Sequence, residues 1–313
     1  MLFASAACLA HAQSAYPAKP ITMYVGFAAG SATDIVARVV GQKLSERLGQ
    51  PVVVQSLTGA ASTLATAAVA RASPDGYTLM TVSGALAIGP AVYSNLKFDV
   101  EKDLTPIGLV GSLPTVLLVN ESLGVNSFSA FVEQARKRPG QLNYGSSGNG
   151  GSTHLSAELL SHTLGIKMTH VPYRGNAPAA SALMAGEVQV LMDTVMLASQ
   201  SVKTNRVRAL AVTGKTRSPV LPDVPTFAEV GLPNFDASIF FGIMGPAKLA
   251  PDIVEKLNRE LNEVLKDPGV KSTLVSGGGL QLSGGTPEQM GQLVHTEVAK
   301  WKRVSQQAGI KAE

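Results

Sequence analysis

Short apolar runs alternate with helical patterns over most of this 313-residue chain, and this alternation constrains the fold more than any other feature. The strand-like run "ITMYVGF" precedes residues 34–48, where apolar residues recur at helical spacing, and Gly49 ends the predicted helix. Further strands are predicted at "PVVVQS", "YTLMTVS", "TVLLVN", "LNYG", "EVQVLMD", "RVRALAVTG" and "DASIFFGIMGP". Strands that alternate with helices in this way predict parallel α/β sheets.

The length of the chain predicts about two domains, at roughly 150 residues each. Two amphipathic helices, at 251–266 and 287–308, finish the chain and need a sheet to pack on. The simplest arrangement returns the chain to the first lobe after it has built the second. We therefore predict lobe I from residues 16–115 with 236–313 and lobe II from residues 116–235, with crossovers near "PTVLLVN" and "PNFDASIFF".

The composition is typical of a globular protein, with 45% apolar and 15% charged residues. The net charge of +4 suits an anionic small molecule as a partner. The sequence has no stripe of Lys and Arg with interleaved aromatic residues. This pattern argues against nucleic acid as a partner.

The N-terminal segment "MLFASAACLAHAQSA" is apolar and rich in small residues, and it contains the A-x-A pattern Ala10-His11-Ala12. The pattern predicts a secretory signal peptide over residues 1–12, with a truncated start left open because the usual basic beginning is missing. We therefore expect a periplasmic protein. Lipid attachment at Cys8 is the alternative, which we disfavour because "SAAC" lacks the usual Leu three residues before the cysteine. Cleavage after Ala12 would remove the one cysteine, so no disulfide or thiol nucleophile is expected.

Two strand-to-helix loops are built alike: the first loop, "VGFAAGSATD" at 25–34, and the second loop, "GSSGNGGS" at 145–152. Each mixes glycine with serine or threonine, and the predicted crossovers place one in each lobe. Ligands of open α/β sheets bind beyond the carboxyl ends of the strands. The first turn of a helix has unpaired N–H groups and a partial positive charge, and glycine lets a ligand approach the backbone. The two loops therefore predict a site that holds an anion, such as a carboxylate, without a charged side chain.

The same loops have a purely structural interpretation, which stays open. Gly-rich turns often do no more than begin a helix. Ser31-x-x-Asp34 fits a capping box, in which the Asp34 side chain would bond back to the backbone of Ser31. Because a carboxylate there would repel an anionic ligand, Asp34 is interpreted first as a cap.

Catalytic and metal-binding motifs are weak in this sequence. Neither Gly-rich loop has the Lys of a Walker loop or the G-x-G-x-x-G pattern, and "GSSG" is not the G-x-S-x-G of a nucleophile elbow. His154, His162, His170 and His295 show no H-x-x-x-H or H-E-x-x-H spacing, so neither a metal site nor a cofactor is expected. His154 follows the second loop and is a candidate for lining the cleft, whereas His162 and His170 are interpreted as ordinary packed or surface residues.

Several longer stretches occur together in one order: "VGFAAGSATDIVAR", "ASPDGYTLM", "LNYGSSGNGGSTHLSAELL", "HVPYRGNAPA", "LMAGEVQVLMD", "VRALAVTGKTRSPVLPDVPTFAEVGLP" and "FFGIMGPAKLAPDIVEKLN". Over about residues 17–312, they resemble the Bug family, the periplasmic binding proteins of tripartite tricarboxylate transport systems. The resemblance implies a type II-like Venus-flytrap fold, with two α/β lobes, two crossover strands and a ligand cleft between the lobes. It also implies a carboxylate ligand, held by both loops partly through backbone N–H groups and bridging waters.

The resemblance also implies particular ligand-binding residues. By position they are Phe27, Ala28, Ala29, Gly30, Ser31 and Asp34 in the first loop, Ser83, Gly84 and Ala85 after a strand, Ser146, Ser147, Gly148, Thr153 and His154 in and after the second loop, Tyr173, Arg174 and Gly175 in a third loop, Asp193 at a strand end, and Phe240. Arg174 would form a charge-assisted bond with a ligand carboxylate. Asp193, if it faced the cleft, would favour a ligand with a hydroxyl or ammonium group. Ring packing for Tyr173, a surface position for Arg174, a cap for Asp193 and a core position for Phe240 are the alternatives.

We therefore expect a solute-binding protein without catalysis, which captures a dicarboxylate, an aromatic acid or an amino acid by closing its lobes. It would act as a monomer and present the ligand to the membrane subunits of a tripartite tricarboxylate transporter. One alternative is a sensor or scaffold that delivers nothing to a transporter. Another is an α/β hydrolase that uses His154 with Ser146 or Ser147.

Overall fold

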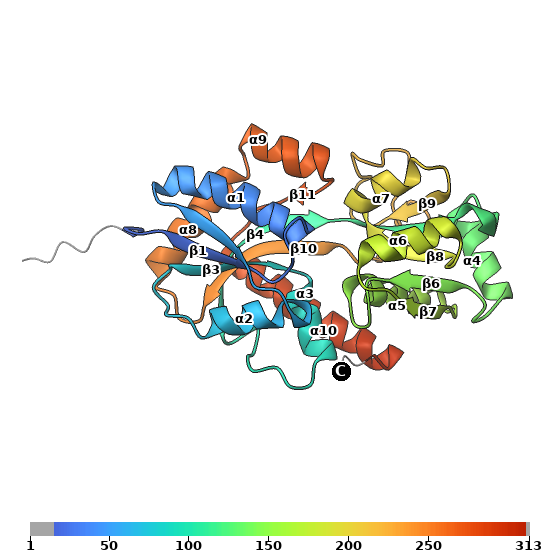
Figure 1. Ribbon diagram of the computed structural model, residues 1–313, viewed down its shortest axis with the longest axis horizontal. Coiled ribbons are helices and arrows are strands. Elements are labelled where there is room, and N and C mark those ends of the chain that lie inside the picture. The colour runs from blue at the N-terminus through green and yellow to red at the C-terminus, as the bar shows by residue number, and fades with distance from the viewer. Residues whose placement is uncertain (1–15, 311–313) are drawn as a thin grey trace, which may run out of the picture.

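The computed structural model of the protein describes residues 16–310, which form two α/β lobes side by side (Figure 1). The predicted signal peptide and Cys8 lie outside the described residues. Within the described range, none of the helices is both long enough and apolar enough to cross a membrane.

The sheet of lobe I has the strand order β2-β1-β3-β10-β4-β11, and β10 runs antiparallel to both of its neighbours. Its strands are β1 (Ile21–Val25), β2 (Val52–Ser56), β3 (Thr78–Ser83), β4 (Leu104–Leu113), β10 (Ile239–Pro246) and β11 (Gln281–Leu282). Its helices are α1 (Ala32–Leu48), α2 (Thr63–Ala70), α3 (Ala85–Val92), α8 (Pro251–Val264), α9 (Pro268–Lys271) and α10 (Pro287–Ala308), with a 3₁₀ turn at Ala60–Ser62 and a π-helical segment at Ser272–Gly277.

The sheet of lobe II has the strand order β7-β6-β8-β5-β9, and β5 runs antiparallel to both of its neighbours. Its strands are β5 (Thr115–Asn120), β6 (Asn143–Ser146), β7 (Thr169–Pro172), β8 (Val190–Thr194) and β9 (Val207–Val212). Its helices are α4 (Phe128–Lys137), α5 (Ser152–Leu164), α6 (Asn176–Ala185) and α7 (Val195–Val202), with a 3₁₀ turn at Glu121–Leu123. In both lobes the fourth strand of the row therefore runs antiparallel to its two neighbours, and in lobe I the edge strand β11 is also antiparallel to β4.

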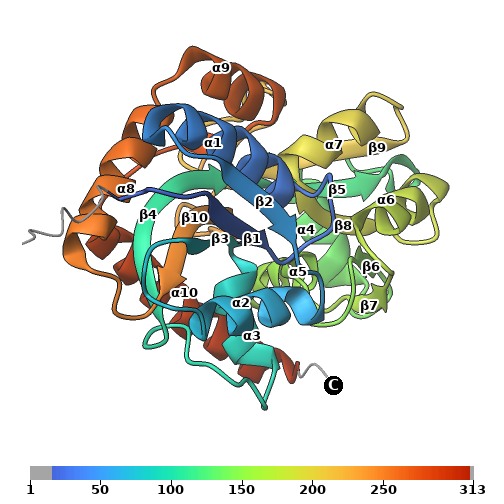
Figure 2. The same cartoon turned by 60° about the vertical axis from the view of Figure 1, so that its left-hand side comes forward.

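The central strands are continuous apolar runs because helices cover each sheet on both faces. All of β5 is buried. Its side chains alternate, so that Leu117 and Val119 pack with α4 and α5, whereas Val116 and Leu118 pack with α6 and α7. In lobe I, α1 and α8 cover one face and α2, α3 and α10 cover the other (Figure 2).

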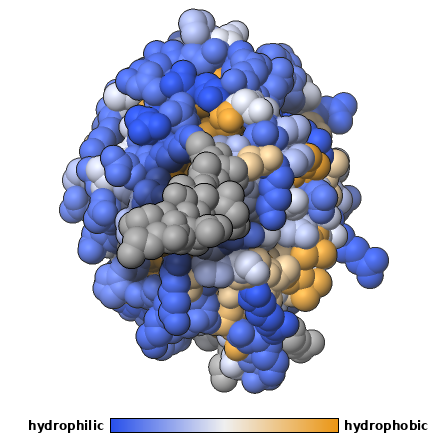
Figure 3. All heavy atoms as spheres, turned by 90° about the vertical axis from the view of Figure 1, so that its left-hand side faces the viewer, coloured by the Kyte–Doolittle hydropathy of each residue, from blue (hydrophilic) through white to orange (hydrophobic). Residues whose placement is uncertain are grey.

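The outer surface and the C-terminal helix complete the arrangement. The end of lobe I that faces the viewer in Figure 3 is mostly hydrophilic, with separate hydrophobic patches. The C-terminal helix α10 packs on α3 and β4 and also contacts α5, so it reaches from lobe I to lobe II (Figure 1).

The chain crosses between the lobes at Pro114, the one residue between β4 and β5, and again between β9 and β10. Thr213, just after β9, connects these crossings. Its Oγ1 accepts the N–H of Thr115 at 2.8 Å and lies 2.8 Å from Oγ of Ser238, just before β10. The segments that join the two lobes are thus hydrogen-bonded to one another.

The sequence patterns do not predict β4, because Pro106, Gly108 and Gly111 lie within it. These residues usually interrupt strands, and here they accompany irregular pairing, since the register between β4 and β10 shifts twice. At Gly111 the backbone of β11 comes so near that a Cβ atom would lie 2.2 Å from the Gln281 carbonyl oxygen. Glycine therefore permits a close approach of two strands at this point.

Candidate functional site

A cavity of about 550 Å³ lies between the lobes, where strands of both sheets meet the beginnings of helices. Residues at the starts of five helices line it: α1 and α3 in lobe I, and α5, α6 and α7 in lobe II. None of its lining residues within the described part of the chain has an ionisable side chain. Backbone groups, hydroxyls, amides and apolar side chains therefore make up its walls.

The first-turn N–H groups of a helix lack partners within the helix, and the helix start carries a partial positive charge. In this cavity Ala32 and Thr33 are in the first turn of α1, and Ser152 begins α5 in the opposite lobe. Helix starts from both lobes are thus directed toward one space. This arrangement can hold an anion by backbone hydrogen bonds alone.

The first loop is held in place by a charged group. Asp34 Oδ2 accepts the N–H of Gly30 at 2.9 Å and Nε–H of Arg38 at 2.9 Å, and the Asp34 N–H donates to Ser31 Oγ at 3.2 Å. Burial alone would raise the pKa of the Asp34 carboxyl, but the hydrogen bonds from Arg38 and Gly30 outweigh this effect and lower it. The predicted bond from Asp34 to the Ser31 backbone is wrong, because the Ser31 N–H donates to the Ala28 carbonyl instead.

The second loop is held in place by neutral groups. Ser146 Oγ lies 2.6 Å from Nε2 of His170, and the Gly150 N–H donates to Nδ1 of His154 at 3.1 Å. The two imidazole rings stack with their centroids 3.7 Å apart, and the ring of Tyr144 stacks on His170 at 4.9 Å. Burial lowers the pKa of both histidines, and the charge of His170 lowers that of His154 further, to about 4. The stacked pair is therefore neutral near pH 7.

A second hydrogen-bonded pair fixes the same loop to the first turn of α5. The N–H of Ser147 donates to Thr153 Oγ1 at 2.8 Å, and the two hydroxyl oxygens lie 2.9 Å apart. Ser147 lines the cavity, whereas Thr153 lies behind it and is almost fully buried. Thr153 therefore acts on the cavity through the position of Ser147.

Asp193 lies at the end of β8 and is fully buried. Its Oδ1 accepts Nδ2–H of Asn176 at 2.7 Å and the N–H of Thr194 at 2.7 Å. Burial raises the pKa of this carboxyl to about 6, even though both hydrogen bonds favour its charged form. Asn176 and Thr194 line the cavity at the starts of α6 and α7, so Asp193 fixes two wall residues from behind and presents no charge to the cavity.

The predicted site residues divide into two groups in the structure. Those that line the cavity are Phe27, Gly30, Ser31, Ser83, Ala85, Ser147, Gly148 and Gly175. Those that do not are Ala28, Ala29, Asp34, Gly84, Ser146, Thr153, His154, Tyr173, Arg174, Asp193 and Phe240. Several of the second group, among them Asp34, His154 and Asp193, hold the wall from behind through the hydrogen bonds described above.

The wall position in β10 belongs to Phe241 rather than to Phe240. Neighbouring side chains of a strand point to opposite faces of the sheet. Phe240 packs with the core on the α10 side, and Phe241 packs on the α1 side, beside Ser83 of β3. The structure thus places Phe240 in the core, the alternative that the sequence left open.

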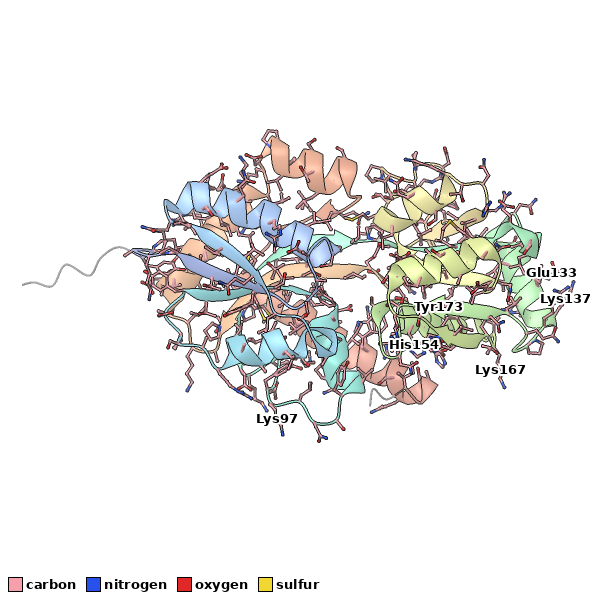
Figure 4. The ribbon with its side chains drawn as sticks, viewed as in Figure 1. Lys97, Glu133, Lys137, His154, Lys167 and Tyr173 are labelled. Carbon is pink, nitrogen blue, oxygen red and sulfur yellow. The ribbon has the colours of Figure 1, made fainter. Side chains whose placement is uncertain are left out.

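The third loop contributes less than the sequence predicts. Arg174 is exposed and does not line the cavity, and the Tyr173 hydroxyl lies 3.5 Å from Oε2 of Glu187. In Figure 4, Tyr173 and His154 lie on the side of lobe II toward lobe I, whereas Lys137 and Lys167 lie at its outer side. From this loop only Gly175 reaches the cavity wall.

Further wall residues were not predicted from the sequence. They are Ala32, Thr33, Ala61, Ile88, Asn149, Gly150, Gly151, Ser152, Asn176, Thr194, Met196, Leu197, Ile239 and Phe241. Asn149 to Ser152 lie within the second loop, so the loop pattern itself could have included them. The residues of α7 could not be found in this way, because "VMLASQSV" after β8 carries no glycine-rich pattern.

Two α/β lobes whose sheets share the arrangement of five strands, with a cavity lined by helix starts between them, define a two-lobed binding protein. Residues 36–310 match the model of the tripartite tricarboxylate transporter family receptor. Protein BugT from Bordetella pertussis is 36% identical over 298 residues, which are 95% of this chain and 91% of BugT. The chain belongs to this receptor family, and the resemblance seen in the sequence is confirmed.

Solved structures agree with this assignment. The structure of an R. palustris protein with adipate has a TM-score of 0.82 and 33% identity, and the match covers 95% of this chain and 99% of that one. MatC from Rhodopseudomonas palustris with bound malate has a TM-score of 0.77 and 32% identity, with 92% and 99% covered. The predicted two-lobed α/β fold is therefore confirmed.

Proposed function

We propose that the protein is a periplasmic solute-binding protein, which captures a small carboxylate between its lobes for a transporter of the tripartite tricarboxylate type. The observation that carries this proposal is the convergence of five helix starts on one interlobe cavity without an ionisable side chain in its lining. Such a cavity favours an anion over a neutral solute. Relatives solved with adipate and malate support a carboxylate as the ligand.

The proposal assigns residues 16–115 with 236–313 to lobe I and residues 116–235 to lobe II, with ligand capture by closure of the lobes. We propose that the wall residues of the predicted set contact the ligand and that Asp34, Ser146, Thr153, His154 and Asp193 act through them. The protein would act as a monomer and bring its ligand to the membrane subunits without changing it chemically. In the alternative role as a sensor, the protein would bind its ligand in the same cavity. The closed form would then contact a partner other than the transporter.

The geometry disfavours the hydrolase alternative. Ser146 is fully buried, and its hydroxyl pairs with His170 rather than with His154. The hydroxyl of Ser147 lies beside Thr153, and Nδ1 of His154 accepts the N–H of Gly150. Neither serine therefore has the accessible serine–histidine pair that a nucleophile requires.

Binding is tested by adding a panel of organic acids to the purified protein and measuring the melting temperature. A ligand at 100 times its Kd adds about 2.7 kcal/mol to the free energy of unfolding, so at least one carboxylate should raise Tm by several degrees. Native mass spectrometry of the protein as purified shows whether an acid is already bound. No shift with any acid, together with no bound acid, would contradict the proposal.

A pair of matched variants tests the location of the site. Ala32 lines the cavity in the first turn of α1, whereas Ala177 is exposed in the first turn of α6 and does not line it. Ala32→Leu should fill the space beside the helix start and abolish the ligand-induced rise in Tm. Ala177→Leu should keep it, and both variants without ligand should melt near the wild type, because Leu is a good helix former.

A further inference from the structure

We infer that the cavity selects an acid with a single carboxylate and an apolar body, aromatic or branched aliphatic, over a dicarboxylate of the same size. The inference rests on the proposed function, since it names the class of ligand for the same cavity. It also separates this chain from the two neighbours solved with adipate and malate, which are dicarboxylates.

The floor of the cavity in lobe I is apolar. It consists of Ile88, Ile239 and Phe241, which we call the apolar floor. Phe241 is paired with Ser83 across β10 and β3. The Ile239 side chain lies against the start of α3, where a Cβ atom on Gly84 would be 3.6 Å from its Cγ2. The strand end and the helix start thus bring these side chains together as one surface.

Apolar side chains continue around the cavity in both lobes. Phe27 lines it from the first loop, and Met196 and Leu197 line it from α7. Leu197 is 46% exposed, which is high for a large apolar side chain. A ligand with a ring or a branched chain would remove this side chain from water, and burial of apolar surface on both partners favours binding.

The opposed first and second loops provide one polar region of the wall, through the first-turn N–H groups of α1 and α5 and the hydroxyls of Ser31 and Ser147. Asn176 and Thr194, at the starts of α6 and α7, add polar side chains in lobe II. One carboxylate can accept hydrogen bonds from this region. At the apolar floor, by contrast, the Ser83 hydroxyl and the start of α3 are the polar groups. A second carboxylate placed there would lose most of its hydration among apolar side chains, which is costly without full pairing.

Charged groups near the cavity do not offer a second carboxylate a partner. Asp34 is bound to Arg38, and Asp193 is buried behind Asn176. Arg174 is exposed and is not among the wall residues. The lysines labelled in Figure 4, Lys97, Lys137 and Lys167, lie on the outer surface of the lobes. A cation for the far end of a dicarboxylate is therefore missing from the described wall.

Isothermal titration calorimetry with matched pairs of acids tests the inference. An isopropyl group has nearly the shape of a carboxylate, so 4-isopropylbenzoate is compared with terephthalate, and 6-methylheptanoate is compared with adipate. The full chain is first freed of any copurified ligand by unfolding and refolding. We expect the monocarboxylate to bind at least tenfold more tightly in at least one pair and the dicarboxylate to be favoured in neither.

Two variants connect this preference with the wall. Leu197→Ser should weaken binding of the preferred monocarboxylate about fivefold, because it removes apolar wall surface. Val53→Ser is the matched control, since Val53 is 44% exposed on β2 and does not line the cavity, and it should leave the affinity unchanged. If Leu197→Ser and the wild type bound the preferred monocarboxylate with equal affinity, the proposed contribution of this apolar wall to binding would be wrong.

The outcomes distinguish the inference from the proposed function. Tighter binding of the dicarboxylate in either pair, or a preference below tenfold in both pairs, would overturn the inference and leave the proposed function standing. Failure of every carboxylate in the wider panel to bind would overturn both. Tighter binding of the monocarboxylates supports both.

Discussion

The first and second loops face one cavity from opposite lobes, and they are fixed by different chemistry. Behind the first loop lies an ion pair, in which Asp34 accepts hydrogen bonds from Gly30 and Arg38. Behind the second loop lies the neutral stack of His154 and His170. Neither loop presents an ionisable side chain to the cavity. The position of the backbone N–H groups matters for an anion site of this kind, and the group that fixes them can be charged or neutral.

The two supports respond differently to acid. The carboxylate of Asp34 keeps its charge until the pH falls below its lowered pKa, so the first loop retains its support through mild acid. The histidines take up protons at a higher pH, although later than free histidine does. A fall in pH should therefore loosen the second loop before the first.

The largest expected effect is a loss of stability in acid that arises at His154. Its pKa is lowered from 6.5 in the unfolded chain to about 4 in the folded protein, so the unfolded state binds more protons between these values. Its contribution to stability is complete above pH 6.5 and is lost as the pH falls toward 4. The loss should be on the order of 3 kcal/mol, measured as the free energy of unfolding in urea at pH 7, 5.5 and 4.

Variants isolate this contribution from the other titrating groups. His154→Asn removes the titration and leaves an acceptor for the Gly150 N–H, so its stability should fall less than that of the wild type between pH 7 and 4. His162→Asn, on the exposed side of the same helix, should behave as the wild type does. Parallel pH profiles for all three proteins would show that the stack does not control stability in acid.

A smaller effect is expected from Asp34→Ala in the first loop. The change removes the acceptor of the Gly30 N–H and of Arg38, and it should cost about 2 kcal/mol of unfolding free energy at pH 7. Arg38→Gln should cost less, because Arg38 is half exposed and the Gly30 bond remains. Urea unfolding measures both, and a cost below about 0.5 kcal/mol for Asp34→Ala would contradict the assigned support.

The smallest effect concerns two glycines at helix starts. Gly30 has φ +82°, so Gly30→Ala should cost about 1 kcal/mol even though no atom would contact the new Cβ within 4 Å. Gly84 has φ −49°, and its Cβ would make an ordinary contact with Ile239. Gly84→Ala should therefore be neutral or slightly stabilising in thermal unfolding. Equal costs at both positions would show that φ is not the cause.

The elements beside the cavity could be predicted where local pattern decides the structure. The first and second loops follow apolar strands and precede helices, and the structure has both junctions at the cavity wall. The strand β4 could not be predicted, because its Pro and Gly residues oppose a strand locally and are accommodated by its neighbours. Long-range pairing overrides local preference there.

Other wall residues depend on contacts that local pattern does not contain. Asn176 follows β7 and Thr194 ends β8, and both reach the wall because these two strands lie on either side of β6 in the sheet. The order of strands in a sheet cannot be deduced from the periodicity of any one strand. The sequence predicts Phe240 in the site, whereas Phe241 lines the cavity, because β10 is buried on both faces and has no polar alternation to show which side faces the cavity. The role of His170 depends on its contact with Ser146, which lies 24 positions away in the sequence, so local pattern does not contain it.

The position of β10 has a consequence for how the protein is made. Synthesis proceeds from the N-terminus, and every strand of the lobe II sheet has been made once Val212 is added. Lobe I still has an empty place between β3 and β4 at that stage, because β10 ends at Pro246. Domains fold as units when their segments become available. Lobe I, although it comes first in the chain, is therefore the second lobe to be completed. Its sheet takes up β10 only after lobe II has formed.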